Sequence, residues 1–287
     1  MAKTGYLAKD LLNWAAGMAT MPALAGRWIA LFTTAPGDND SGAVEVSGGA
    51  YARAQLAGTA ATSAATSSGA TLTFSSVPSW VAAGMTVLDL ATPAAIGAGV
   101  TVSSKTSTTV TLSASVSGTV GSGDTIAFSV FPAATGAGPA NITSSAALSF
   151  PQATASWGTV VAWGVYDAAT SGNLLYWDWL GNDPWFPFDC TDASPGVLTA
   201  YGITAGSSPA LANGAAVAIT ARFGGTLPSG LSSETVYTVA GLSADAFNVG
   251  AGTSSTGSGM VRQVTQQPIA QNVTFSIPSG SLLIYES

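Results

Sequence analysis

The side chains able to do chemistry are few in this sequence, and four of them gather in one short stretch. Asp183, Asp189 and Asp192 surround the only cysteine, Cys190. A hard cation such as calcium takes roughly six to eight oxygen ligands, often from a loop of alternating acids. The spacing of these three acids matches no such loop, so we interpret them as solvated or helix-capping residues and predict no metal site.

Cys190 has two interpretations. It lies between Asp189 and Thr191, and a neighbouring carboxylate raises the pKa of a thiol, so a catalytic thiolate is not expected. The residue is either a small, half-buried side chain or the site of a disulfide to another chain, because a cysteine without a partner in its own chain can crosslink subunits.

A second acidic group, Asp38, Asn39 and Asp40 with Gly42, is closer to a calcium loop but lacks the distal glutamate of such loops. We interpret it as a turn. Paired carboxylates could also hydrolyse a glycosidic bond, which requires two acids about 5–9.5 Å apart. No pair stands out by its motif, so we predict no catalytic residue and no cofactor.

The composition excludes several further classes of function. The 287-residue chain has no histidine and one cysteine, which excludes a Ser-His-Asp triad, a His-ligated metal and a disulfide within the chain. Seven basic residues and a net charge of -7 argue against a nucleic-acid-binding surface. Only 7% of the residues are charged, against about 25% in ordinary soluble domains.

Large aromatic residues form a third group of candidate functional side chains. They are Trp177, Trp179, Trp185, Phe186 and Phe188. Alternate side chains of a strand point to opposite faces, so Tyr176, Trp177 and Trp179 must place rings on both faces. We expect the aromatic group in the core and in a subunit interface, and the alternative is a platform that stacks on sugar rings.

Short strands separated by glycine-rich turns must position these groups. The expected strands cover residues 28–34, 51–56, 70–74, 86–90, 99–104, 108–113, 125–130, 146–150, 158–166, 174–180, 217–222, 235–240, 246–249, 269–277 and 281–285. The small residues of 57–70 indicate a linker or edge. Residues 181–196 are rich in proline, which removes ladder donors, so no regular strand is expected there.

This pattern predicts an all-β protein with one N-terminal α-helix, built as a β-sandwich-like core that carries two inserted small β modules. The core would combine residues 1–59, 136–190 and 264–287. The inserted modules would be residues 60–135 and 191–263. Insertion at exposed loop tips is tolerated because the two ends of an insert lie close together.

The N-terminal segment predicts an amphipathic helix with Thr4 as its N-cap. Its apolar face would consist of Leu7, Leu11, Trp14, Ala15 and Met18. The alternative is a signal peptide, although Asp10, Asn13 and Pro22 interrupt its apolar part. The mean hydropathy is +0.40, yet no apolar run approaches the roughly 18 residues of a spanning helix, so no membrane insertion is predicted.

Three blocks of sequence follow a recognisable order. The first includes Ile29-Ala30-Leu31-Phe32-Thr33-Thr34-Ala35-Pro36 and Glu45-Val46-Ser47-Gly48-Gly49 before Tyr51-Ala52-Arg53. The second runs from Phe150 to Trp177, and the third is Phe275-Ser276-Ile277-Pro278-Ser279-Gly280-Ser281-Leu282. This order resembles a family of tailed-bacteriophage structural proteins, usually labelled tail fibre or minor tail proteins. Residues 184–195 depart from the family's pattern.

The resemblance implies a non-enzymatic structural subunit of the virion, assembled in the host bacterial cytoplasm. It would be homo-oligomeric and attached at the tail, the neck or collar, or the head surface as a fibre or decoration. Its partners would be further copies of itself and other virion proteins, with neither nucleic acid nor a membrane among them. The alternative is an adhesin module that binds a host receptor or surface glycan.

Overall fold

The computed structural model describes residues 2–19, 26–134, 141–181, 183–190, 196–201, 211–222, 225–233, 235–250 and 255–285. They are almost entirely β-structure, with one α-helix, α1 (Gly5–Ala15), and a short 3-10 helix at Pro93–Ala95. The predicted all-β class with one N-terminal helix is therefore confirmed. In the described part of the chain, no helix has the length and apolar character needed to cross a bilayer.

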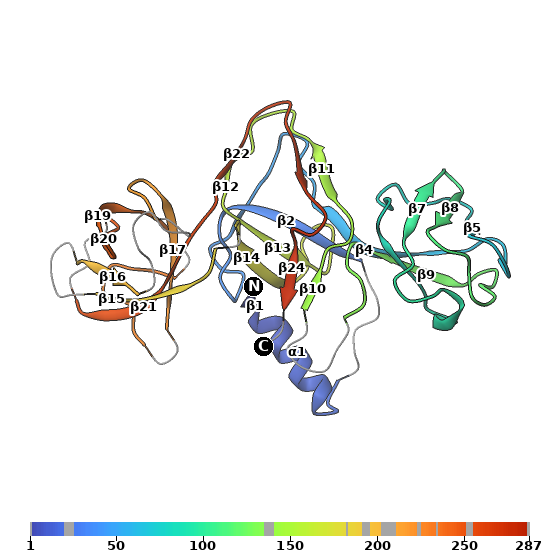
Figure 1. Ribbon diagram of the computed structural model, residues 1–287, viewed down its shortest axis with the longest axis horizontal. Helices are drawn as coiled ribbons and strands as arrows, with labels where there is room; N and C mark the ends of the chain where they lie inside the picture. The colour runs from blue at the N-terminus through green and yellow to red at the C-terminus, as the bar shows by residue number, and fades with distance from the viewer. Residues whose placement is uncertain are drawn as a thin grey trace.

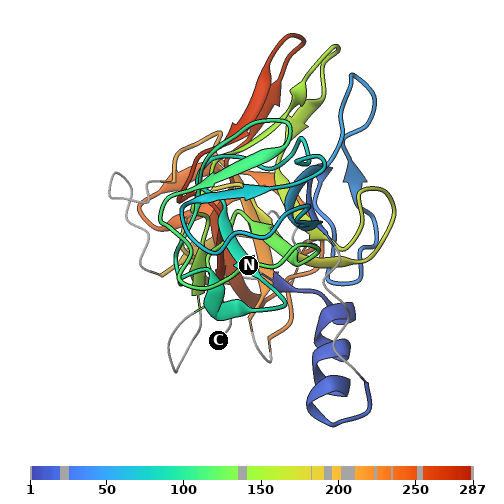
Figure 2. The ribbon, with the colours of Figure 1, turned by 90° about the vertical axis from the view of Figure 1, so that its right-hand side faces the viewer.

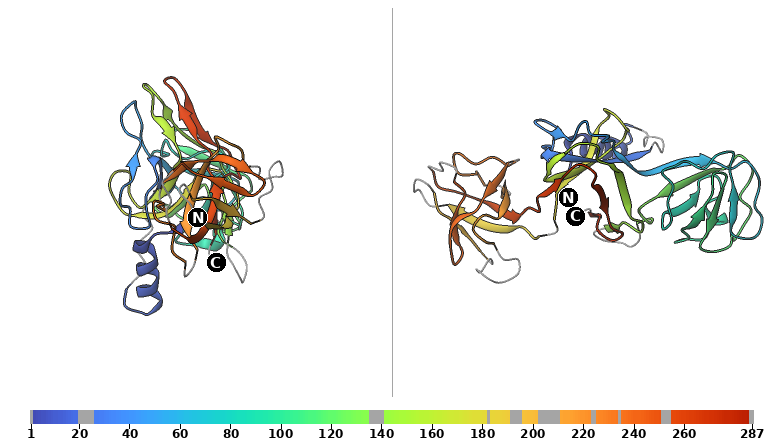
Figure 3. Two further views of the ribbon diagram at one scale, coloured as in Figure 1. Left: turned by 90° about the vertical axis from the view of Figure 1, so that its left-hand side faces the viewer. Right: turned by 90° about the horizontal axis from the view of Figure 1, so that it is seen from above.

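Three lobes lie in a row, with a central body between two outer lobes (Figure 1 and Figure 3). We call residues 62–130 the first lobe and residues 186–263 the second lobe. An eight-stranded sheet runs from the central body into the first lobe, in the order β1 (Ala2–Lys3), β14 (Leu174–Trp179), β13 (Ala162–Tyr166), β2 (Arg27–Thr34), β4 (Ala54–Ala61), β9 (Thr125–Ser129) and β6 (Thr86–Asp89), with β3 (Val44–Glu45) beside β2. All five residues of β13 are buried, because both faces of this sheet are covered.

A long antiparallel ribbon completes the central body. It consists of the pairs β10 (Asn141–Thr143) with β24 (Leu283–Tyr285), β11 (Leu148–Gln152) with β23 (Thr274–Ile277), and β12 (Gly158–Val160) with β22 (Gln267–Ile269). Residues 158–166 and 269–277 were each expected to form one continuous strand, but each forms two. One break falls near Asn272, whose φ of 67° lies in the left-handed region, and the other separates β12, in the ribbon, from β13, in the main sheet.

The first lobe packs a three-stranded sheet against the end of the main sheet. That smaller sheet has the order β5 (Thr71–Thr73), β8 (Thr109–Leu112), β7 (Val102–Lys105), close to the predicted strands. Residues 57–70 were expected to form a linker or edge. Their first part is instead a strand, because β4 continues to Ala61 and pairs with β9 from Ala57 to Ala61. Ile126 and Phe128 of β9 supply the buried bulk that the small residues of β4 lack.

The second lobe contains a seven-stranded sheet that twists around its own core. Its order is β18 (Val236–Thr238), β17 (Ala216–Ala221), β21 (Gly257–Gln263), β15 (Phe186–Cys190), β16 (Leu198–Ala200), β20 (Ala246–Asn248) and β19 (Ala240–Ser243). Three of its inner strands, β15, β16 and β21, were not expected from the sequence. β15 precedes the predicted module boundary at 190/191 yet lies in this sheet.

β15 is a strand although it contains Pro187, which corrects the expectation for residues 181–196. It pairs with β21 on one side and β16 on the other. A strand residue directs its nitrogen and its carbonyl to the same neighbour, and the Pro187 carbonyl accepts a hydrogen bond from the Tyr201 N–H at 2.8 Å. The proline nitrogen therefore faces the β16 side, beyond Ala200, and the ladder with β21 loses no donor.

β21 is an inner strand although its glycines predicted turns up to residue 259. A Cβ atom on Gly259 would lie 2.7 Å from the Phe188 ring and 2.7 Å from the Thr220 carbonyl oxygen. Real Cβ atoms do not approach so closely. Glycine is required here because the Phe188 ring packs directly onto the backbone, and not because the chain turns.

Hydrophobic clusters cross the borders between the lobes. The largest joins the central body to the first lobe, from Leu31 and Trp163 to Leu72 and Phe128. A second cluster packs Phe32 and Trp179 of the central body with Ala216 and Ala218 of the second lobe. The third lies within the second lobe. The outer lobes therefore share buried side chains with the body.

Candidate functional site

The N-terminal helix is fixed at its root to the central sheet. β1 adds to the edge of β14. The buried Thr4 donates its hydroxyl to the Leu174 carbonyl at 2.6 Å and its N–H to the Leu175 carbonyl at 3.1 Å. The Gly5 N–H donates to the Asp38 carbonyl at 2.9 Å. The helix therefore leaves the sheet in a fixed direction.

Both ends of α1 are capped. Thr4 Oγ1 accepts a hydrogen bond from the Leu7 N–H at 3.4 Å, which confirms the predicted N-cap. At the other end Gly17 adopts a φ of 71°, and the Met18 N–H donates to the Asn13 carbonyl at 2.8 Å, as in a Schellman motif. These caps stabilise a helix of 11 residues, a length that is marginal in water, where roughly 12–15 residues are needed.

The body of α1 projects away from the sheets (Figure 2), and none of its described residues is buried. The predicted apolar face is covered only near the root, where Leu7 packs against the core. Further along the same face, Trp14 is 49% exposed and Met18 is 80% exposed, and Leu12 beside them is 71% exposed. An amphipathic helix of this kind can pack its apolar face against another helix or into an apolar groove, and contiguous exposed apolar area commonly marks interaction sites.

A polar network holds together the loops of the central body. The Arg53 guanidinium makes two hydrogen bonds to Glu45, from Nε at 2.9 Å and from Nη2 at 2.7 Å. It lies 3.5 Å from the centre of the Tyr166 ring, and Nη1 donates to the Ser171 carbonyl at 2.7 Å. The Tyr51 hydroxyl donates to Glu45 Oε1 at 3.0 Å. Arg53 thereby ties β3 to the hairpin between β13 and β14.

The two phenols of this network stay neutral at neutral pH, and Arg53 stays charged. Burial raises the pKa of the Tyr51 and Tyr166 hydroxyls well above the usual range, and the nearby carboxylates Glu45 and Asp40 raise the two values further. Burial alone would lower the pKa of Arg53, but its hydrogen bonds to Glu45 outweigh this and raise it. Neutral phenols beside a permanent cation make a structural network. The sequence analysis placed Tyr51 and Arg53 in an expected strand and in a family block, and predicted no contact between them and Tyr166.

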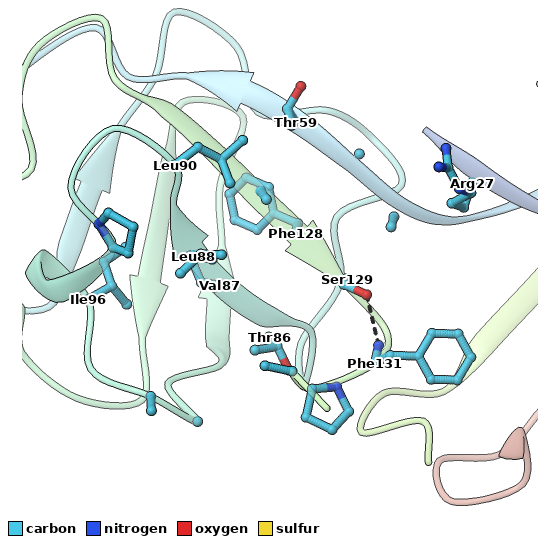
Figure 4. Close-up of a pocket in the computed structure, with 18 residues that line it drawn as sticks. Arg27, Thr59, Thr86, Val87, Leu88, Leu90, Ile96, Phe128, Ser129 and Phe131 are labelled. Atoms are coloured by element: carbon cyan, nitrogen blue, oxygen red, sulfur yellow. Dashed lines mark hydrogen bonds between the residues drawn. The ribbon is translucent and has the colours of Figure 1, made fainter. Parts of the chain in front are cut away.

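A groove lies on the outer face of β4, β9 and β6, where the main sheet runs into the first lobe (Figure 4). Its volume is about 400 Å³. Small residues, Ala57, Thr59, Ala127 and Ser129, lie on β4 and β9, and larger side chains surround them: Leu88, Leu90, Ile96 and Phe131. Among the described residues that line it, Arg27 is the one with a charge. The groove offers apolar area but little to orient a charged ligand.

The structure separates the five predicted aromatic residues. Trp177 and Trp179 are buried between the central sheet and the second lobe, and Phe188 is buried in the second lobe's own cluster. Trp185 and Phe186 are half-buried. Three of the five therefore fill the core of the chain itself, and only Trp185 and Phe186 retain area that a partner or ligand could cover.

Trp185 lines a cleft of about 610 Å³ between the central body and the second lobe. Arg262 of β21 crosses the base of this cleft and is 5% exposed. Its Nη1 lies 3.0 Å from Asp178 Oδ1, and its Nη2 donates to the carbonyls of Trp179 at 3.1 Å and Gly181 at 3.2 Å. This ion pair was not predicted, because β21 was not recognised as a strand.

Cys190 is 5% exposed and packs with Phe188 and Leu198 in the cluster of the second lobe. A disulfide to another chain would therefore require this cluster to open first.

The acids near Cys190 have separate positions. Asp183 lines the cleft. Asp189 accepts a hydrogen bond from the Tyr201 hydroxyl at 2.7 Å on the exposed side of β15. Asp192 lies outside the described residues.

The acids of the predicted turn are bonded to side chains of the central sheet. Asp38 Oδ1 accepts from Trp177 Nε1 at 3.1 Å, and Asp40 accepts from the Tyr166 hydroxyl at 3.0 Å. Burial raises the pKa of Asp40, and the hydrogen bond from Tyr166 partly offsets this. Within the ranges that the structure describes, no three cysteine, aspartate or glutamate side chains are grouped as ligands of a metal ion.

Comparison with known families gives the class of the protein: it is a structural component of a phage virion. The family model described as podophage GP4 fiber I protein gp80 matches residues 2–131 and, in a second overlapping match, residues 88–183. These matches cover more than half of the chain, which therefore belongs to this phage tail fibre family. No curated protein matches the chain.

The family match confirms the resemblance to tail fibre proteins. The first two sequence blocks, up to residue 177, lie within the matched residues. The third block, residues 275–282, and the whole second lobe lie beyond residue 183, where the match ends.

Proposed function

We propose that this fibre protein is a non-enzymatic, homo-oligomeric subunit that joins further copies of itself through α1. The observation that supports this is the helix itself, which is fixed at its root, capped at both ends and uncovered along its apolar face. The two lobes extend sideways from the body and away from this contact. The assembly forms in the host cytoplasm and attaches at the tail, the neck or collar, or the head surface.

A second copy of the chain is the occupant that the helix favours. The only charged residues of α1 are Lys9 and Asp10, so identical helices carry no net charge and do not repel one another. Apolar residues at spacings of three and four, such as Leu7, Leu11 and Trp14, form the seam along which helices pack. Burying a side chain of the size of Met18 contributes about 1.5–3 kcal/mol, which a projecting helix gains only from a partner.

Light scattering after size-exclusion chromatography tests the self-association. The full chain should form oligomers whose population rises with protein concentration. The Trp14→Ser/Met18→Ser variant should be monomeric at concentrations where the unmodified chain is assembled. The matched control is Val44→Ser/Leu88→Ser, which replaces two exposed apolar residues elsewhere and should assemble normally.

Attachment to the virion is tested separately. Particles that lack this protein are mixed with the purified chain or with the Trp14→Ser/Met18→Ser variant, and bound protein is measured after sedimentation. Loss of binding by the variant supports attachment through an α1-dependent oligomer. A chain that is monomeric at every concentration and binds particles equally with or without Trp14 and Met18 contradicts the proposal.

A further inference from the structure

The outer edge of the antiparallel ribbon lacks a neighbouring strand. In the part of the chain that the structure describes, β22, β23 and β24 each pair on one side only, with β12, β11 and β10. Such an edge is a row of unpaired N–H and C=O groups, which proteins usually protect with charged residues or prolines. Residues 267–285 contain no charged residue, and Pro268 and Pro278 lie on either side of β23. Between these two prolines, the edge of β23 has neither protection.

The hydrogen bonds of the ribbon show which backbone groups of β23 face the open edge. The Ala153 N–H donates to the Val273 carbonyl at 2.9 Å. The adjacent residues Gln152 and Thr274 lie opposite each other and therefore form a pair that exchanges no hydrogen bonds, so Thr274 directs its N–H and C=O away from β11. The extra residue of this irregular pairing lies in β11, so β23 alternates regularly and Ser276 faces the same way as Thr274. Both residues are exposed.

This edge borders the cleft between the central body and the second lobe, whose volume is about 610 Å³ and whose lining includes residues 275–278. β23 has four residues, and a strand laid along it would be about 13 Å long. With about 4.8 Å to the next strand and about 10 Å to the next sheet, such a strand occupies roughly 600 Å³. An α-helix of the same length, at least 10 Å across, needs roughly 1,000 Å³. The size of the cleft therefore fits a short extended segment.

The charges of the cleft favour an uncharged segment. Its charged lining residues in the described part of the chain are Asp178, Asp183 and Arg262. Asp178 balances the charge of Arg262, 3.0 Å away, and Asp183 repels acidic side chains. The Arg262 guanidinium lies 5.3 Å from the centre of the Trp185 ring, so a basic side chain on that ring would be repelled. Apolar side chains can pack on the half-buried Trp185 and on Leu283, which is 43% exposed.

We propose that an extended, uncharged segment of a neighbouring virion protein adds to β23 in this cleft and anchors the fibre protein to the particle. Its N–H and C=O groups pair with those of Thr274 and Ser276, and its apolar side chains pack on Trp185 and Leu283. Main-chain hydrogen bonds give affinity in such strand addition, and alternate side chains give specificity. The chain belongs to a structural family of the virion, so the proteins held beside it are other virion proteins. The inference rests on the proposed role as a virion subunit but does not involve α1, so the two can fail separately.

Hydrogen exchange, read at single residues by mass spectrometry, tests the site on the full chain. The chain is measured free and bound to particles that lack this protein. In the free chain the amides of Thr274 and Ser276 should exchange fast, whereas those of Phe275 and Ile277, which face β11, should be protected. On the particles, exchange at Thr274 and Ser276 should slow at least tenfold.

Three results of this experiment overturn the proposal. The first is slow exchange of Thr274 and Ser276 in the free chain, because the edge would already be covered. The second is unchanged exchange of both amides on the particles. The third is protection of both amides in the concentrated chain without particles, because the occupant would then be a second copy.

A proline substitution tests the contribution of the open edge to attachment. Ser276→Pro removes an N–H that faces away from β11, which a strand tolerates at its edge, and should weaken binding to the particles tenfold or more. The matched control is Ser149→Pro, opposite Ser276 on β11, because its N–H faces the other edge of the ribbon; this variant should bind normally. Circular dichroism checks the fold of both variants, and light scattering should show α1-dependent oligomers for both. Equal binding of the two variants to the particles overturns the proposal.

Discussion

Arg53 is the residue on which the polar interior of the central body depends. Its guanidinium contacts Glu45, the Tyr166 ring and the hairpin carbonyl of Ser171 at once. Lysine cannot make two parallel bonds to a carboxylate or lie flat on a ring. The sequence indicated the importance of Arg53 only through its place in a family block. No local pattern shows that Arg53 will contact Tyr166 and Ser171, which lie more than 100 residues away.

Replacing Arg53 by methionine tests this role. Removal of one partner of a buried ion pair commonly costs about 3–5 kcal/mol, and the partial exposure of Glu45 places the expected loss of unfolding free energy at the lower end. Urea unfolding followed by tryptophan fluorescence measures it. The control Lys9→Met removes an exposed cation from α1. A loss for Arg53→Met no greater than that for Lys9→Met would contradict the assignment.

The buried phenols make stability depend on alkaline pH. Unfolded tyrosines ionise near pH ~10, whereas burial raises the pKa of Tyr51 and Tyr166 well above that. The folded state then keeps protons that the unfolded state loses, so this stabilisation is full below about pH 10 and is lost as the pH rises further. Unfolding free energies measured at increasing pH should fall less steeply for Tyr51→Phe/Tyr166→Phe, and an unchanged slope would argue against buried, protonated phenols.

Cys190 should be protected from reagents in the folded chain. Its sulfur packs in the cluster of the second lobe with Phe188 and Leu198, so a thiol-specific dye should react slowly in buffer and completely in urea. Rapid reaction in buffer would show that the cluster opens readily, as an interchain disulfide requires.

Among the elements, α1 depends on its caps more than on packing. Thr4 both caps the helix and bonds the Leu174 carbonyl. Its buried position at the root was not predictable from spacing, although its capping role was, because the N-cap signal is local. The strands show the same difference between local signals, which the sequence contains, and tertiary contacts, which it does not reveal. Alternating apolar residues predicted most of the strands, but Pro187 and Gly259 were interpreted as breaks because their tertiary partners lie far away in sequence.

Thr4→Ala should loosen the helix selectively. Loss of an N-cap costs about 1 kcal/mol, so amide hydrogen exchange should quicken in α1 while β13 remains protected. Thr4→Ser keeps the hydroxyl and should preserve the exchange pattern. Equal exchange in Thr4→Ala and the unmodified chain would mean that contacts along α1, rather than its cap, hold it.

At the scale of the whole molecule, the largest hydrophobic cluster couples the first lobe to the central body, because it contains side chains of both. Side chains from the predicted core and from the predicted module 60–135 lie in the same buried set. The sequence suggested separable modules because small polar stretches resemble linkers. Nothing in the sequence pattern indicates that β4, a strand of the main sheet, continues into the first of these stretches as far as Ala61 and pairs with β9 there.

Leu72→Ala tests this coupling. Removing a fully buried leucine costs about 2–5 kcal/mol, and because Leu72 shares a cluster with Trp163, amide protection in β13 should fall together with that in the first lobe. The control Leu198→Ala, in the second lobe's cluster, should affect β13 less. Undiminished protection of β13 in Leu72→Ala would show that the first lobe unfolds alone.

The passage of β4 from the body into the first lobe limits how such fibres can diversify by recombination. A single inserted or deleted residue within β4 between Gly58 and Ala61 would turn every later side chain of the strand to the opposite face. A foreign lobe grafted at this point must therefore preserve the alternation of β4 and supply a strand that pairs with β4 as β9 does. The second lobe is reached through the short connection 180–185, whose length does not set a strand register, and this makes it the easier of the two to exchange.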